Sequence, residues 1–193
     1  MLTDFFLKML NREASSPGRG AVRILDSLRI TEGQTIADIG SGGGYFTLEF
    51  ARRVGASGRV FAVDSKRKYM DFIRRQSERV GLDNIEFILA ESGGVRLPAS
   101  SVDLIFARNV FHHLPEPARY FGNLGAALKP RGRVAIIDHT PERGLSFVKM
   151  FRHFTPVEKI RETMESAGYV LYESFNFLPG QSFLVFGCLD EKH

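Results

Sequence analysis

The chain has 193 residues, of which 44% are hydrophobic and 25% charged, and its formal net charge is +4 at pH 7. This length suits a single domain with a proper core, and this composition is typical of a globular protein and not of a disordered one. No apolar run is long enough to span a bilayer, the N-terminus lacks a secretory signal pattern, and the charge does not demand a nucleic-acid partner, so we expect a cytoplasmic protein.

The first 30 residues are expected to form two short helices, over 5–10 and 22–28, joined by a segment rich in Ser, Pro and Gly. We treat residues 1–30 as a helical N-terminal part and residues 31–193 as an α/β core, both within one domain of 1–193. Phe5, Phe6 and Leu10 are expected either to cover one face of a sheet or to lie over a binding site.

From residue 35 the hydrophobic pattern alternates between strands and helices, which favours a mostly parallel α/β sheet. Strands are predicted over 35–39, 59–64, 85–89, 102–107 and 134–138, and helices over 45–54, 66–80, 117–128 and 156–167. The tail departs from this repeat, because two strand-like runs, 169–177 and 182–189, are separated by a Leu-Pro-Gly-Gln turn. An antiparallel hairpin is therefore predicted at the end.

The junction between the first strand and its helix carries the pattern D-x-G-x-G-x-G, with Asp38, Gly40, Gly42 and Gly44. A dinucleotide fingerprint, G-x-G-x-x-G, would need its third glycine at the position of Tyr45. Asp38 would also repel a pyrophosphate, whereas it could organise an ammonium group. The loop therefore favours a ligand bearing an amino acid. A nicotinamide oxidoreductase and a glycine-rich turn without a ligand are the weaker alternatives.

This stretch resembles motif I of class I S-adenosylmethionine-dependent methyltransferases. The terminal hairpin is similar to the ending of their Rossmann-like, doubly wound, seven-stranded and mostly parallel sheet. The general similarity is greatest to the small-molecule branch that includes quinone C-methyltransferases. The resemblance implies S-adenosylmethionine as the cofactor, a small, apolar or aromatic molecule as the methyl acceptor, and residues 1–30 as a lid over both.

The resemblance also assigns positions to the cofactor. The glycines bracket the methionine moiety, Asp64 holds the ribose, Glu91 flanks the adenine, and the residues after 102–107 line the methionine and acceptor pocket. Asp64 could instead cap the following helix, and Glu91 could be a solvated surface residue. The cofactor-binding residues expected are Asp38, Gly40, Ser41, Gly42, Gly44, Asp64, Ser65, Glu91, Arg108 and Asn109.

Three residues are candidates for proton transfer from the acceptor: His112, His113 and Asp138. A neutral imidazole near the pocket could accept a proton from a hydroxyl group or a carbon acid as the methyl group moves. The two histidines could equally cap or pack, and without a third ligand in the sequence they make a weak metal site, so no metal is expected. The sequence after 102–107 lacks N/D-P-P-Y/F, which argues against methylation of an exocyclic base nitrogen.

Other functions stay open at this point. A catalytically silent S-adenosylmethionine-binding module and an RNA methyltransferase are the alternatives, and a homodimer is possible. A basic, aromatic segment over 143–154 could form a further lid or pack on the sheet. Cys188, the single cysteine, is expected to be buried in the last strand and rules out a mechanism that needs several thiols, such as thiol-rich arsenite methylation.

Overall fold

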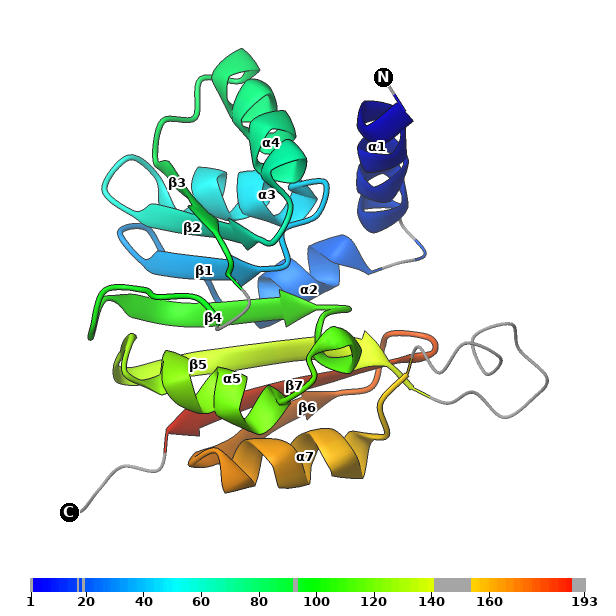
Figure 1. The fold of residues 1–193 in the computed structure, drawn as a ribbon, viewed down its shortest axis with the longest axis vertical. Helices are drawn as coiled ribbons and strands as arrows, with labels where there is room; N and C mark the ends of the chain where they lie inside the picture. The colour runs from blue at the N-terminus through cyan, green and yellow to red at the C-terminus, as the bar shows by residue number, and fades with distance from the viewer. Residues whose placement is uncertain (1, 17, 19, 92–93, 141–153, 189–193) are drawn as a thin grey trace.

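A computed structural model describes residues 2–16, 18, 20–91, 94–140 and 154–188, so most of the segment 143–154 lies outside the described residues. The chain folds around a seven-stranded sheet with the order β3-β2-β1-β4-β5-β7-β6 (Figure 1). The strands are β1 Thr35–Ile39, β2 Arg59–Asp64, β3 Ile85–Leu89, β4 Val102–Arg108, β5 Leu128–His139, β6 Tyr169–Phe175 and β7 Gln181–Cys188. The helices are α1 Leu2–Ser15, α2 Ala21–Ser27, α3 Tyr45–Val54, α4 Arg67–Arg79, η2 Phe111–His113, α5 Pro117–Gly125 and α7 Val157–Ser166.

The topology confirms the predicted fold class. Strands β3, β2, β1, β4 and β5 pair in parallel, and β7 inserts antiparallel between β5 and β6. Chain order reverses between β1 and β4, which is the point where open α/β sheets bind ligands. Because β7 runs antiparallel, its first residue, Gln181, pairs with the last residue of β5, His139. Both therefore lie at the ligand-binding edge.

The prediction for β5 was too short and that for α5 too long. The helix was expected to run to residue 128 and the strand to begin at residue 134, but β5 already begins at Leu128. Leu128 pairs with Val102 and Arg133 with Leu104, so the four residues 129–132 of β5 lie opposite the single residue Asp103 of β4. Arg131 there has a left-handed φ of 66°. Proline and a left-handed residue thus make an irregularity within one strand.

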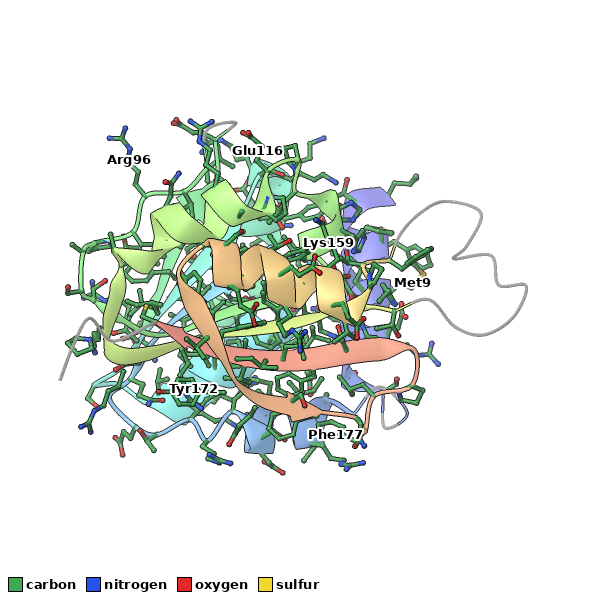
Figure 2. The ribbon with its side chains drawn as sticks, turned by 90° about the horizontal axis from the view of Figure 1, so that it is seen from below. Met9, Arg96, Glu116, Lys159, Tyr172 and Phe177 are labelled. Atoms are coloured by element: carbon green, nitrogen blue, oxygen red, sulfur yellow. The ribbon has the colours of Figure 1, made fainter. Side chains whose placement is uncertain are left out.

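Two apolar clusters cover the two faces of the sheet. Alternate residues of β4 show this division, because Ile105 belongs to the cluster under α5 and α7, whereas Leu104 and Phe106 belong to the cluster under α2 and α3. Figure 2 shows α5 and α7 side by side on one face. Leu104, Ile105 and Phe106 are all buried, as expected for a central parallel strand.

The N-terminal helix does not cover the sheet. Helix α1 stands beside α3 and α4, near the carboxyl ends of the strands (Figure 1). Leu7 is its one buried residue, while Phe5 is 74% exposed. The idea that Phe5, Phe6 and Leu10 cover a sheet face is therefore wrong. Cys188 is also exposed and not buried, because it ends β7 at the rim of the sheet.

Among the described residues, no helix combines the length and hydropathy needed to cross a bilayer.

Candidate functional site

The loops at the carboxyl ends of β1 to β5, together with α1 and the start of β7, enclose one cavity of about 790 Å³. All ten residues expected to bind the cofactor line this cavity, and so does His113. Parallel strands deliver their carboxyl ends to a single edge, so segments far apart in the sequence meet there. His112 and Asp138 are not among the lining residues.

The loop between β1 and α3 needs glycine for two reasons. Gly40 and Gly44 have φ values of 70° and 81°, in the left-handed region that residues with a Cβ rarely adopt. Both are also crowded: a methyl group on Gly40 would overlap Cγ2 of Val110, and one on Gly44 would lie 2.6 Å from Cγ1 of Ile73. The loop therefore presents bare backbone to the cavity.

Asp38, the second-to-last residue of β1, is buried and lines the cavity. Its Oδ2 accepts a hydrogen bond of 2.5 Å from the hydroxyl of Thr47 in α3. Burial raises the pKa of Asp38 to about 7, and the nearby charge of Asp64 adds to that rise, while the Thr47 hydrogen bond opposes it. A cationic ligand group beside this carboxyl would favour its ionised form.

Asp64, at the end of β2, organises the loop next to it. Its Oδ2 accepts from the backbone N–H of Gly42 at 3.1 Å, and its Oδ1 accepts from the N–H of Lys66 at 3.0 Å. The alternative role as a helix cap does not apply, because the residue that caps α4 is Lys66, with no side-chain cap bond. Each carboxylate oxygen keeps a further acceptor position for a hydroxyl group in the cavity.

Glu91, after β3, lies in a short loop that is closed by its own backbone. The N–H and C=O of Glu91 pair with the C=O and N–H of Gly94 at 3.1 and 3.0 Å. Glu91 lines the cavity and is exposed. Tyr120 of α5, which the sequence reasoning missed, lines the same end, and burial raises its pKa to about 12. Tyr120 therefore stays a neutral hydroxyl group.

Beyond β4 a polar network joins residues that are distant in the sequence. The side-chain amide of Gln181 donates to Oδ1 of Asn109 at 2.6 Å, and its Oε1 accepts from Arg108 at 3.3 Å. Asn109 has a left-handed φ of 57°, and its N–H donates to the carbonyl of Ile137. Sequence reasoning missed Gln181, because only the antiparallel insertion of β7 brings it to this edge.

The expected proton acceptors divide into two groups. His112 and Asp138 form a buried pair: Nδ1 of His112 lies 2.6 Å from Oδ1 of Asp138, and their side chains are 6% and 0% exposed. The N–H groups of His112 and His139 also donate to Asp138, at 2.9 and 2.8 Å. Asp138 already accepts hydrogen bonds from these donors, and neither His112 nor Asp138 lines the cavity, so the structure does not bring this pair to the cavity wall as expected.

His113, the third expected proton acceptor, lines the cavity together with His139. The ring centroid of His112 lies 4.0 Å from that of His113 and 6.2 Å from that of His139. In the part of the chain that the structure describes, no three His, Cys, Asp or Glu side chains gather as a metal site.

The strand order arranges these groups along the edge. From β3 to β7 the cavity passes Glu91, Asp64, the glycine-rich loop, Asn109 and finally His139 with Gln181. Five inter-strand steps of about 4.8 Å give an edge on the order of 24 Å long. The half toward β3 holds the backbone cradle and three acidic side chains, Asp38, Asp64 and Glu91, and the half toward β7 holds imidazoles and amides.

A comparison of the sequence with protein-family models matches a methyltransferase domain family over residues 30–177. Among curated proteins, the chain is 34% identical over 106 residues to an arsenite methyltransferase of Halobacterium salinarum, covering 55% of this chain and 27% of that protein. It is 35% identical over 106 residues to a protein-L-isoaspartate O-methyltransferase of Methanococcoides burtonii, covering 54% and 51%.

It is also 25% identical over 115 residues to the ubiquinone/menaquinone biosynthesis C-methyltransferase of Escherichia fergusonii, covering 59% of this chain and 46% of that protein. The chain thus spans between a quarter and half of the length of these relatives. In three dimensions it is similar to a SAM-dependent methyltransferase from Aquifex aeolicus, with a TM-score of 0.80, 24% identity, and coverage of 95% and 97%.

Because the family model covers more than half of the chain, this protein belongs to the methyltransferase domain family. The family predicted from Asp38 to Gly44 and from the terminal hairpin is confirmed. S-adenosylmethionine is the methyl donor that this family implies. The three relatives act on chemically unlike acceptors, so family membership leaves the acceptor undefined.

Proposed function

We propose that this protein transfers a methyl group from S-adenosylmethionine to a small, apolar or aromatic acceptor. The carrying observation is the cavity itself, which extends along the sheet edge from the glycine-rich loop to His139 and Gln181. Its lining includes apolar side chains, among them Phe6 and Leu10 of α1 and Leu114 after η2. A volume of about 790 Å³ is toward the upper end of the usual range for ligand sites, which suits two ligands side by side.

The residues toward β3 fit the cofactor. Bare backbone at Gly40 and Gly44 lets a ligand approach the loop, and the buried carboxyl of Asp38 suits an amino acid's ammonium group. Asp64 keeps acceptor positions for ribose hydroxyls, and Glu91 lies one strand further along for the adenine. When bound, S-adenosylmethionine supplies a methyl group on a positively charged sulfur.

The residues toward β7 would align the acceptor and handle its proton. Methyl transfer needs an in-line approach and exclusion of water, so positioning is the main task of the protein. His113 and His139 each present an imidazole that could accept a proton at a ring nitrogen. Asp138 binds the backbone N–H and the ring of His112 and thereby ties η2 to the end of β5.

Binding and turnover can be measured separately. Calorimetric titration with S-adenosylhomocysteine and with NADH tests the cofactor, and we expect binding of the first alone. Turnover is then measured with methyl-labelled S-adenosylmethionine against quinones, phenols, fatty acids, RNA and an isoaspartyl peptide. We expect label in an aromatic or apolar molecule.

Label in RNA, with binding that weakens steeply with salt, would support the RNA methyltransferase alternative instead. Tight binding of S-adenosylhomocysteine with no labelled product from any class would favour the silent binding module.

A further inference from the structure

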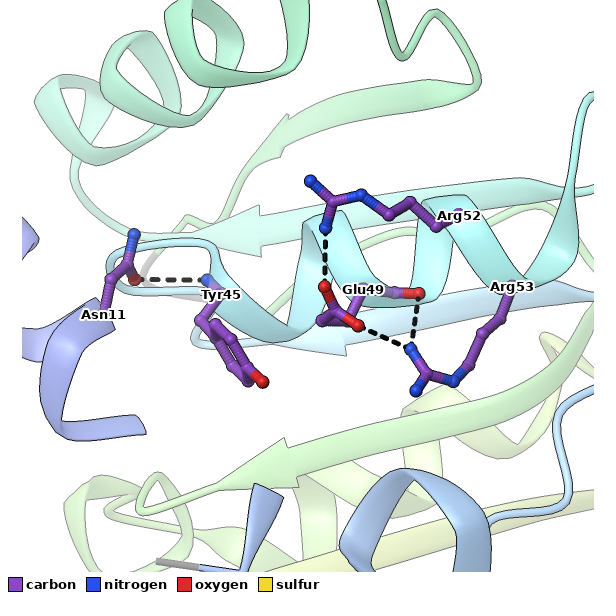
Figure 3. Close-up of polar contacts among 5 residues, drawn as sticks. All are labelled: Asn11, Tyr45, Glu49, Arg52 and Arg53. Atoms are coloured by element: carbon purple, nitrogen blue, oxygen red, sulfur yellow. Dashed lines mark hydrogen bonds and ion pairs between the residues drawn. The ribbon is translucent and has the colours of Figure 1, made fainter. Parts of the chain in front are cut away.

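We propose that Asn11 is a positioning residue that locks α1 onto the glycine-rich loop, so that docking of α1 and binding of the cofactor stabilise each other. The inference rests on the proposed function for its cofactor, but its starting point is a contact that the proposed function does not use. Figure 3 shows Asn11 of α1 reaching Tyr45 at the first turn of α3.

Asn11 makes two hydrogen bonds with the backbone of the loop. Its Nδ2 donates to the carbonyl of Gly43 at 2.6 Å, and its Oδ1 accepts from the N–H of Tyr45 at 3.2 Å. Tyr45 is the first residue of α3, whose N-cap, Gly44, offers no side-chain bond. A helix leaves its first N–H groups without intrahelical partners. Asn11 therefore supplies from another helix the cap that α3 lacks.

Gly43 shows that the loop is shaped to receive α1. Unlike Gly40, Gly42 and Gly44, it does not have a positive φ, so its backbone conformation does not require glycine. A methyl group at this position would overlap Oδ1 of Asn11 and would lie 2.7 Å from the carbonyl oxygen of Leu7. The missing side chain makes room for α1.

The rest of α1 is held weakly. Leu7 is its one buried residue, and the ion pair between Asp4 and Arg75 joins two half-exposed side chains at 3.0 Å. Exposed ion pairs of this kind contribute little to stability. The two Asn11 bonds therefore add to Leu7 in fixing this helix against the body of the protein.

Docked α1 forms a wall of the cavity that faces the loop. Phe6, Leu10, Asn11, Glu13 and Ala14 all line the cavity. If the cofactor binds more tightly when this wall and the loop are in place, then by linkage it must also hold α1 in its docked position, by the same factor.

The test compares Asn11→Ala, Gly43→Ala and the double variant with the wild type. The probe is S-adenosylhomocysteine, measured by calorimetry, and amide hydrogen exchange follows residues 2–15 with and without it. We expect each single variant to weaken binding about tenfold, and the double variant to bind about as tightly as the weaker-binding single variant, because both changes separate α1 from the same loop. In the free protein, exchange in α1 should rise about tenfold in Asn11→Ala.

Arg75→Ala is the matched control, because it removes a different polar contact of α1 and leaves the loop untouched. We expect its affinity to stay within twofold of the wild type. Circular dichroism and the melting temperature show whether each variant folds. If Asn11→Ala does not fold, Gly43→Ala takes its place in the test.

Unchanged affinity and unchanged α1 exchange in Asn11→Ala would overturn the inference. So would additive losses in the double variant, or α1 exchange in the wild type that does not slow on binding. Failure of the wild type to bind S-adenosylhomocysteine would instead contradict the proposed function. Amide hydrogen exchange of α1 in the ligand-free variants would still test whether Asn11 holds α1 on the loop.

Discussion

The two halves of the cavity are built in different ways. Toward β3, the ligand-facing groups come from short consecutive stretches, chiefly residues 38–44 and 64–66, and many of them are backbone atoms. Toward β7, side chains arrive from distant segments, and the amide pair of Asn109 and Gln181 joins residues 72 positions apart. A backbone cradle can be recognised from local sequence, whereas a side-chain cluster depends on how the strands are ordered.

This difference has a chemical consequence. A cradle of N–H groups and carboxylates suits one ligand shared by a family, while a cluster of side chains can change with the acceptor. The relatives with arsenite, isoaspartate and quinone in their names match this chain over about half its length. We expect substitutions in the first half to abolish cofactor binding and those in the second half to alter stability or acceptor use.

The largest effect is expected for Gly40→Ala. The methyl group would combine a left-handed φ of 70° with overlap of Val110, so strain and overpacking together cost about 2–5 kcal/mol. Affinity for S-adenosylhomocysteine, measured by calorimetry, should fall by about a hundredfold or more. Adding Val110→Ala should recover part of the loss by removing the overlap. No recovery would mean that backbone strain alone is responsible.

Asp138→Asn tests the other half. Three N–H groups from His112 and His139 converge on this buried carboxylate, and an amide would turn its own N–H₂ toward at least one of them. We expect a loss of about 2–3 kcal/mol in the free energy of unfolding, measured with urea, because a buried donor stays unsatisfied. Glu116→Gln, in an exposed ion pair, is the control and should change little. Equal stabilities of the two variants would contradict this reading.

The raised pKa of Asp38 predicts how protein stability and ligand affinity change with pH. Its pKa of about 7 in the folded protein lies above the ordinary value of 3.8, so the folded state keeps a proton that the unfolded chain releases between these values. Asp38 therefore makes the ligand-free protein less stable as pH rises from about 4 to about 7. An ammonium group favours the ionised carboxylate, so S-adenosylhomocysteine should bind about tenfold more tightly at pH 8 than at pH 6.

Asp38→Asn is the control for this window. It should remove both pH dependences, as seen in urea unfolding and in calorimetry at the two pH values. Calorimetry in buffers of different ionisation enthalpy should also show release of a proton on binding at pH 6 by the wild type alone. Affinity that is flat with pH in the wild type would place the ammonium group away from Asp38.

The smallest effect is expected for Glu49→Ala, on the outer side of α3. Glu49 pairs with Arg52 and Arg53 at 2.6 Å each, on partly exposed positions of one helix (Figure 3). Such pairs contribute about 0.3–0.5 kcal/mol each, so thermal or urea unfolding should show a loss below about 1 kcal/mol. Affinity for S-adenosylhomocysteine should not change. A tenfold loss of affinity would contradict this expectation, because it would show that the outer side of α3 affects the glycine-rich loop.

Much of the fold could be predicted because local pattern and burial agree along the core strands and helices. The predicted bounds of β1, α3, β2 and β3 match the structure, since each has a clear period and a glycine or turn at its ends. The error around β5 arose at residues 129–132, where Pro130 and Gly132 are typical of a loop but lie within a strand. Such an irregularity depends on pairing with β4, which the local pattern does not contain.

The sequence by itself determined the glycine-rich loop, its two carboxylates, the alternating core and the final hairpin, because these depend on residues that are near each other along the chain. Tertiary structure alone decided that Asp138 and His112 are a buried pair, that Gln181 reaches the cavity, and that Asn11 caps α3. Strand order and helix docking bring these groups together across long separations, so no local spacing could have shown them.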